Sequence, residues 1–290
     1  MKPAQFEYHA PTSAEEAVGL LAELDDAKAI AGGQSLVPML ALRLAVFENL
    51  VDLRRLDELR GIEPRDGSVW IGAATTQATI GRSEEIGLQI PLLARATPLI
   101  GHLQIRNRGT IGGSIAHADA SAEYPAVALA LDVELEALSP RGRRTIPAAD
   151  FFTGTWSTEL DDDELLTGIT FPVWEGRTGF AVEEFARRHG DFAMAGACVA
   201  VGVGSDGRID RCAISLFGLG PCARRATAVE SELIGSSPAD SNPDEIGRSA
   251  MAGLDSVPSD LHGSARYRRR VGAAMVARAW RHALQEAVGD

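Results

Sequence analysis

The chain has 290 residues, which is more than one average domain needs, so we expect two domains or one domain with sub-lobes. Its 45% hydrophobic content is ordinary for a folded protein. Its formal net charge of −12 disfavours nucleic acid and anionic membranes as partners, because both require a basic face.

The first 56 residues read as a small β-α-β unit. A short strand is expected at 6–8, followed by an S-x-x-E capping box at Ser13 and Glu16 that opens an amphipathic helix. A second strand at 28–31 ends at a glycine pair, a helical turn follows at 36–44, and a third strand at 50–53 closes the unit.

The middle of the chain mixes both element types. We expect strands at 69–71, 133–137 and 165–171, and helical segments within 76–82, 91–100 and 126–131. From about residue 178 three strands are expected, at 180–186, 195–203 and 209–218, and a turn at 205–208 joins the last two as a hairpin. Two helices, at 242–253 and 264–287, end the chain.

Cysteine content and apolar runs exclude further classes. The three cysteines (Cys198, Cys212 and Cys222) are too few for a four-cysteine metal or iron–sulfur site. We expect them to be reduced thiols in the interior of the protein. No secretory signal pattern opens the chain, and the longest uncharged apolar stretch, 192–204, is too short to span a bilayer. We therefore expect a cytoplasmic protein with no integral membrane segment and no metal ligands of its own.

The first motif with chemical potential is Ala31-Gly-Gly-Gln-Ser-Leu36, which directly follows a predicted strand. A glycine pair lets the backbone turn tightly and approach a ligand, and successive amides in such a loop bind anions. Ser35 adds a hydroxyl donor. A plain tight turn is the alternative interpretation.

The second motif is Thr110-Ile-Gly-Gly-Ser114, closely followed by His117, Asp119 and Glu123. Amides and hydroxyls suit phosphate, and carboxylates suit the hydroxyls of a sugar or ribityl chain. The two loops together predict a shared pyrophosphate site, although a purely structural role for the glycines stays open.

Other patterns carry no chemistry. The G-x-G-x-x-G match at 202–207 precedes a strand-like run rather than the helix that a dinucleotide site needs, so it indicates a hairpin. His117 and Asp119 are two residues apart and would lie on the same side of a strand. We interpret them as a structural hydrogen-bonded pair and not as a base or a metal ligand. The four tryptophans read as core or interface filling, and we expect no catalytic residues.

The motifs resemble a known family. AGGQSL at 31–36 and QIRNRGTIGGSIAHADASAEYPA at 104–126 are similar to the medium, FAD-binding subunits of molybdenum hydroxylases, which include the carbon monoxide dehydrogenase medium chain and the FAD domain of xanthine dehydrogenase. LVDL at 50–53, IGAATT at 71–76, ARRHGDFAMA at 186–195 and HGSARYRR at 262–269 extend the resemblance along nearly the whole chain.

The resemblance implies an α+β protein. Its FAD-binding domain, of the vanillyl-alcohol-oxidase (PCMH) type, would span 1–177 in sub-lobes of about 1–56 and 57–177. A C-terminal α+β domain with a small antiparallel sheet and helices would span 178–290.

The resemblance also implies the cofactor site. FAD would bind noncovalently, its pyrophosphate on Ala31 to Ser35 and on a second cradle from Thr110 to Ser114, with Leu166 and Phe192 beside the flavin. The residues implied in FAD binding are Ala31, Gly32, Gly33, Gln34, Ser35, Leu36, Thr110, Ile111, Gly112, Gly113, Ser114, Asp119, Glu123, Leu166 and Phe192. The chain departs from the family at Glu184, where relatives often carry lysine, and at Gln34, where carbon monoxide dehydrogenases often carry histidine.

The function implied is that of an oxidoreductase subunit. The substrate would be hydroxylated at a molybdenum cofactor in a large subunit, and the electrons would pass through two [2Fe-2S] clusters in a small subunit. The chain would accept these electrons and pass them to an external acceptor. A dimer of heterotrimers is the assembly that the resemblance implies. A free-standing FAD-dependent oxidase or dehydrogenase of the same fold is the alternative. A third hypothesis is a noncatalytic scaffold protein that kept the fold and lost the flavin.

Overall fold

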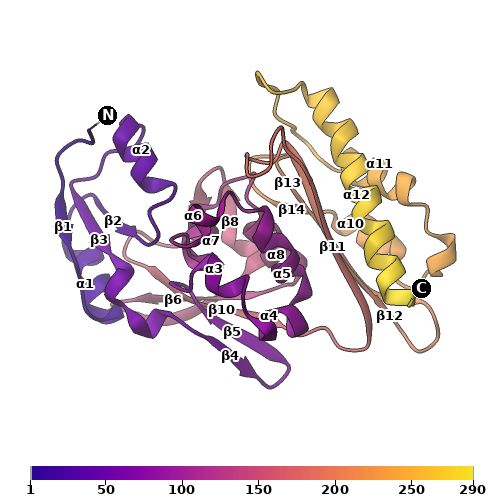
Figure 1. Ribbon diagram of the computed structural model, residues 1–290, viewed down its shortest axis with the longest axis horizontal. Helices are drawn as coiled ribbons and strands as arrows, with labels where there is room; N and C mark the ends of the chain where they lie inside the picture. The colour runs from indigo at the N-terminus through magenta and orange to yellow at the C-terminus, as the bar shows by residue number, and fades with distance from the viewer. Residues whose placement is uncertain (1, 290) are drawn as a thin grey trace.

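The structure of the chain is a computed structural model that describes residues 2–289 (Figure 1). Its strands form three main sheets, which follow one another across the molecule in chain order. Helices fill the space between the second and third sheets, and other helices cover the outer face of the third. This mixture of sheets and helices confirms the expected α+β class.

The first sheet is parallel, with strand order β1-β3-β2. The capping box is confirmed in part, because the Ser13 hydroxyl accepts a hydrogen bond from the Glu16 amide at the start of the first helix. The elements of this lobe are β1 (Glu7–His9), α1 (Ala14–Glu23), β2 (Ala27–Ile30), α2 (Leu36–Leu42) and β3 (Asn49–Asp52).

The second sheet is antiparallel, with order β4-β5-β10-β6-β7. Its strands are β4 (Ile62–Arg65), β5 (Ser68–Gly72), β6 (Glu134–Ser139), β7 (Gly142–Pro147) and β10 (Leu165–Pro172), and a small hairpin is formed by β8 (Phe152–Gly154) and β9 (Ser157–Thr158). The helices are α3 (Gln77–Ile80), α4 (Glu84–Gln89), α5 (Pro91–Ala96), α6 (Leu103–Arg106), α7 (Ile111–His117), α8 (Glu123–Ala130) and α9 (Ala148–Phe151). Short 3-10 turns lie at Leu53–Arg55, Asp57–Leu59, Thr97–Leu99 and Pro238–Asp240.

The third sheet is also antiparallel, with order β11-β12-β13-β14. Its strands are β11 (Arg177–Phe185), β12 (Ala195–Val203), β13 (Ile209–Phe217) and β14 (Arg224–Arg225). Its helices are α10 (Thr227–Leu233), α11 (Pro243–Ala252) and α12 (Ala265–Val288). One face of this sheet packs against α5 and α8, and α12 covers the other (Figure 1).

Small residues let the third sheet pack closely on both faces. Every residue of β12 is buried, as its run of alanine, glycine, valine and cysteine predicts for a central strand. Gly179 of β11 lies against α12, where an added Cβ atom would overlap the carbonyl oxygen of Ala283 and come within 2.7 Å of the amide nitrogen of Ala287. The resulting core joins the sheet firmly to both helical layers.

One local prediction is wrong. His117 and Asp119 do not share a strand, because His117 ends α7 and Asp119 lies in the loop beyond it. The Thr110 hydroxyl caps this helix by accepting from the Gly113 amide, and the cap and tertiary packing outweigh the low helix propensity of two glycines. Within residues 2–289, no helix is both long enough and apolar enough to cross a membrane.

Candidate functional site

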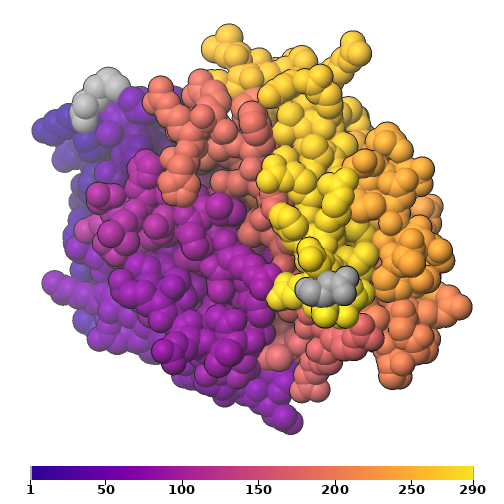
Figure 2. All heavy atoms as spheres, turned by 45° about the vertical axis from the view of Figure 1, so that its right-hand side comes forward, coloured from indigo at the N-terminus to yellow at the C-terminus, as the bar shows by residue number. Residues whose placement is uncertain are grey.

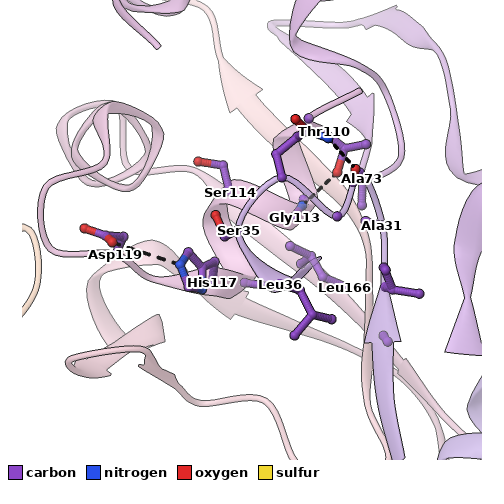
Figure 3. A pocket seen from close by; sticks show the side chains of 18 of the residues that line it. Ala31, Ser35, Leu36, Ala73, Thr110, Gly113, Ser114, His117, Asp119 and Leu166 are labelled. Atoms are coloured by element: carbon purple, nitrogen blue, oxygen red, sulfur yellow. Dashed lines mark hydrogen bonds and ion pairs between the residues drawn. The ribbon is translucent and has the colours of Figure 1, made fainter. Parts of the chain in front are cut away.

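A cavity of about 500 Å³ opens between the first sheet, the middle helices and the loop that joins β11 to β12. This volume is typical of cofactor sites. Segments far apart in the sequence line it, including the loop after β2, the start of α7, the hairpin β8-β9, strand β10 and residues 190–192 (Figure 3 shows part of the lining). The fold therefore brings both glycine motifs into one cavity.

The loop after β2 presents free backbone donors to this cavity. The amides of Gly32, Gly33, Gln34, Ser35 and Leu36 donate to no acceptor within residues 2–289. Gly33 adopts φ +71°, a left-handed conformation that glycine reaches without strain, and the side-chain amide of Gln34 donates from Nε2 to the Gly32 carbonyl at 3.1 Å. Five successive free N–H groups make a site for an anion such as a pyrophosphate.

The second glycine motif uses its amides differently. The Ile111 amide donates to Thr75 O at 3.0 Å and the Gly112 amide to Ala73 O at 2.8 Å, while Gly113 donates to the Thr110 hydroxyl. These amides are therefore already paired within the protein. Ile111 is buried in the core and does not line the cavity. Thr110, Gly112, Gly113 and Ser114 do line it, so this motif offers a close backbone surface and the Ser114 hydroxyl.

The glycines also let the two motifs touch. A Cβ atom on Gly32 would overlap the carbonyl oxygen of Arg108 and lie 2.8 Å from the Cα of Gly109. A Cβ atom on Gly113 would lie 2.8 Å from the Oγ1 atom of Thr110, closer than real Cβ contacts, and 3.4 Å from the Ala31 side chain. The loops are thus two walls of one cradle, which explains physically why both need small residues.

Carboxyl groups gather at another part of the lining. Asp119 accepts from the Ser121 amide at 2.8 Å, and its Oδ2 atom lies 4.0 Å from Nε2 of His117. Figure 3 marks the pairing of His117 with Asp119 by a dashed line. Burial lowers the pKa of His117. Glu123, at the start of α8, is only 8% exposed, and burial, reinforced by the charges of Glu184 and Asp119, raises its pKa to about 8. Such a carboxyl is protonated at neutral pH and can donate a hydrogen bond.

Aromatic and apolar groups complete the lining. Leu166 of β10 lies in it with 4% exposure, and Phe192 is 75% exposed at its edge. The tryptophans were expected to fill core or interface positions, but Trp156 instead lines this cavity with 58% exposure, and its ring stacks on His117 at 6.2 Å. Nothing in the sequence spacing marks Trp156, because only the turn between β8 and β9 carries it here.

Gln77 is a second residue that sequence reasoning missed. It lines the cavity, and its buried side-chain oxygen receives no hydrogen bond from residues 2–289. It follows the IGAATT stretch at 71–76, which is the one signal that points to it. A bound ligand with an N–H or O–H donor would satisfy this oxygen.

These residues together fit FAD. Free amides suit its pyrophosphate, carboxyl groups suit its ribityl hydroxyls, and the apolar and aromatic groups suit its rings. No group of three or more histidine, cysteine or acidic side chains within residues 2–289 is arranged to hold a metal ion.

Comparisons with known proteins agree with this chemistry. Residues 4–174 match the FAD binding domain in molybdopterin dehydrogenase, and residues 180–283 match the CO dehydrogenase flavoprotein C-terminal domain. The chain is 42% identical to the 6-hydroxypseudooxynicotine dehydrogenase complex subunit alpha of Paenarthrobacter nicotinovorans, over 99% of this chain and 97% of that protein.

It is also 40% identical to the carbon monoxide dehydrogenase medium chain of Hydrogenophaga pseudoflava, over 96% of this chain and 97% of that one. A solved structure of carbon monoxide dehydrogenase from Hydrogenophaga pseudoflava, in a form that lacks the Mo-pyranopterin moiety of the molybdenum cofactor, superposes with a TM-score of 0.95 at 40% identity over 99% of both chains.

Proposed function

The chain belongs to the family of FAD-binding medium subunits of molybdopterin dehydrogenases, and from this we propose that it relays electrons from the [2Fe-2S] clusters of a small subunit, through FAD, to an external acceptor. It is the flavoprotein subunit of a multi-subunit oxidoreductase, and the molybdenum cofactor belongs to a separate subunit. The single observation that carries the FAD-binding role, on which the electron-relay proposal rests, is the cavity with five free amides on one glycine loop and a second glycine motif packed against it.

We assign the cofactor contacts by position in this cavity. The amides of the Gly32 to Leu36 loop bind the pyrophosphate, and Ala31 and the Thr110 to Ser114 motif form the opposite wall. Asp119 accepts hydrogen bonds from cofactor hydroxyls, Glu123 lies beside the ribityl or phosphate region, and Leu166 and Phe192 contact the flavin rings. Ile111 holds α7 in the core and acts on the cofactor only indirectly.

Bound FAD supplies a redox centre that accepts single electrons and delivers a pair. The chain's own residues bind and orient this group noncovalently and shield it from water. The paired amides of Ile111 and Gly112 hold the second wall rigid, so that the cradle is formed before the cofactor enters. No proton-shuttling triad is needed in such a subunit.

The assembly follows from this role. We propose a heterotrimer with a small iron–sulfur subunit and a large molybdenum subunit, which pairs into a dimer of heterotrimers in the cytoplasm. We also propose that the chain divides into an FAD-binding domain at 1–177, with sub-lobes of about 1–56 and 57–177, and a C-terminal domain at 178–290. The large subunit selects the substrate, since the molybdenum chemistry occurs there.

The decisive experiment is to purify the chain with whatever copurifies, record its absorption spectrum and release the cofactor with acid. Released FAD, together with iron and molybdenum on two copurifying chains, is the expected result. FAD on a lone chain that oxidises a substrate by itself would favour the free-standing flavin enzyme. A colourless chain that takes up no FAD would overturn the proposal.

A further inference from the structure

Helix α2 and the loop after it form an exposed apolar segment on the first lobe. The stretch 36–47 contains no polar or charged residue except Arg43. A helix that is apolar on every side is normally buried in the interior of a protein. Of the seven residues of α2, however, only Leu40 is buried, and Figure 1 shows the helix at the edge of the first lobe. Such an exposed apolar segment marks an interaction site.

The sides of α2 have different surroundings. Leu36 and Met39, which lie three positions apart on one side of the helix, line the FAD cavity. The helix is therefore a wall that has the cofactor cavity on its inner side. Four other apolar side chains of the segment are more than half exposed and are called here the outer α2 surface, namely Val37, Leu42, Leu44 and Val46.

A charged cavity adjoins the outer α2 surface. Its volume is about 450 Å³, and its lining includes Val37 of α2 together with Arg54 and Arg108. Arg54 forms an ion pair with Asp52 at 2.8 Å. The exposed Arg108, by contrast, pairs with no carboxylate within residues 2–289. The apolar surface thus lies beside a guanidinium group that is free to bind a carboxylate of another protein.

The position of α2 indicates which protein covers it. The chain is one subunit of a multi-subunit oxidoreductase, so its partner chains are the natural occupants of an exposed apolar surface. The helix directly follows the loop with five free amides, and its inner side lines the FAD cavity. A protein that delivers electrons to FAD has to dock beside this cavity, because electron transfer slows steeply with distance. The electron donor is therefore the partner that this position fits.

We propose that the outer α2 surface and the cavity at Arg108 form the docking site of the small iron–sulfur subunit, which presents an apolar patch and a carboxylate to them. The inference rests on the proposed function, because it specifies where the electron donor of that function binds. The apolar side chains fill the centre of the interface, and the pair between Arg108 and the partner's carboxylate fixes the orientation of the two subunits.

The test identifies the protein that touches Leu44 in the assembled complex. The full-length chain, with p-benzoylphenylalanine in place of Leu44, is coexpressed with the small and large subunits, and the purified complex is irradiated. We expect a covalent adduct with the small subunit, which mass spectrometry identifies. The same photo-crosslinking residue in place of Leu88, which is 80% exposed on α4, is the matched control and should give no adduct with the small subunit.

Substitutions at the same two leucines measure the contribution of the apolar surface. Leu44→Glu should raise the Kd for the small subunit about tenfold or more, because it buries an unpaired carboxylate in an apolar interface. Leu88→Glu should leave this Kd unchanged. Sedimentation velocity over a dilution series of the purified complex measures the Kd, and thermal melting followed by circular dichroism shows whether each variant is folded.

A second set of variants tests the charge at the cavity. Arg108→Glu should also raise the Kd for the small subunit about tenfold or more, because it places two carboxylates next to each other. Arg108→Lys keeps the positive charge and should raise the Kd less. Arg82→Glu, at an exposed arginine before α4, is the matched control and should behave like the natural chain.

The outcomes separate this inference from the function on which it rests. An adduct of the Leu44 position with the large subunit, with a second copy of this chain, or with no protein at all would overturn the docking site and leave the FAD site standing. An unchanged Kd in Leu44→Glu would do the same. If no iron–sulfur subunit copurified with the natural chain, the proposed function itself would be wrong.

Discussion

The indole ring of Trp156 stacks on the imidazole of His117, with ring centroids 6.2 Å apart and 12° between the planes. Trp156 reaches this position with φ +54°, a conformation that costs a non-glycine residue energy. It lies on the cavity wall although more than half of its surface is open to solvent. An exposed, strained aromatic residue on a cofactor cavity is a candidate for ligand stacking.

We predict that Trp156→Ala weakens FAD binding about fivefold, because one aromatic stacking contact is worth about 1 kcal/mol. Trp156→Phe should lose less. The measurement is flavin fluorescence during FAD titration, which reports on the cofactor and therefore works equally in variants that lack Trp156. Equal FAD affinity in the natural chain and in Trp156→Ala would show that the ring does not touch the cofactor.

Gly112 supports the second wall of the cradle. A Cβ atom there would overlap the Ala73 side chain and lie 2.7 Å from the Ala73 carbonyl oxygen, which accepts the Gly112 amide. We predict that Gly112→Ala lowers the free energy of unfolding by about 1–3 kcal/mol through overpacking. Chemical denaturation measures this loss.

Gly87 provides the matched control for that substitution. It lies inside α4, and an added Cβ atom would meet nothing within 4 Å. Gly87→Ala should therefore raise the free energy of unfolding by about 0.5–1 kcal/mol, since alanine favours a helix. If both variants changed stability alike, close packing at Gly112 would not be the cause.

Much of the fold was predictable because its strongest signals are local. β12 was predicted at 195–203 and has these bounds, since a run of small apolar residues ends there at a glycine turn. The helices α11 and α12, predicted at 242–253 and 264–287, begin after Asn242 and Ser264, whose side chains cap them. The strands β4 and β7 were missed because both are sheet edges, where exposed charged residues replace the apolar alternation.

The site was predictable where it depends on backbone chemistry. Both glycine motifs line the cavity, because a glycine pair marks a close backbone approach in the sequence itself. Trp156 and Gln77 carry no such mark. Their places depend on long-range packing that brings a hairpin turn and a short helix to the same cavity.

Arg95 and Glu286 link the middle helices to the C-terminal helix. Arg95 donates two hydrogen bonds to Glu286, at 2.6 and 2.7 Å, and Glu286 also accepts from the Phe180 amide at 3.0 Å. Arg95 holds the pKa of Glu286 below its ordinary value. Because both side chains are more than a third exposed, we predict that Glu286→Gln lowers the free energy of unfolding at pH 7 by about 1 kcal/mol or less.

The size of this effect depends on pH. A carboxyl whose pKa is lowered by folding contributes stability above its unfolded pKa and loses it as the pH falls through the folded value. The difference between the natural chain and Glu286→Gln should therefore shrink below about pH 4. Arg82→Ala, at an exposed arginine in the loop before α4, should change stability by no more than about 0.5 kcal/mol at either pH.

The raised pKa values of Glu123 and Glu184 predict that the stability of the FAD-free chain has the opposite dependence on pH. Folding raises the pKa of both groups, to about 8 and about 7, so the folded state binds more protons than the unfolded state above the ordinary value of 4.5. Their contribution is complete below that value and is lost as the pH rises through the folded values. His117, whose pKa is lowered, acts in the opposite sense only up to about its ordinary value of 6.5.

The window from pH 7 to pH 8 therefore isolates the two carboxyls, because Cys198 and Cys212, whose pKa values are raised by burial, affect the pH dependence only near and above their ordinary value of 9.0. Across this window we predict a falling Tm in the FAD-free chain, with a loss of at most about 1.4 kcal/mol per pH unit for each group that ionises. The double variant Glu123→Gln, Glu184→Gln should flatten the profile, since glutamine does not titrate. A slope that persists in the double variant would assign the titration to other groups.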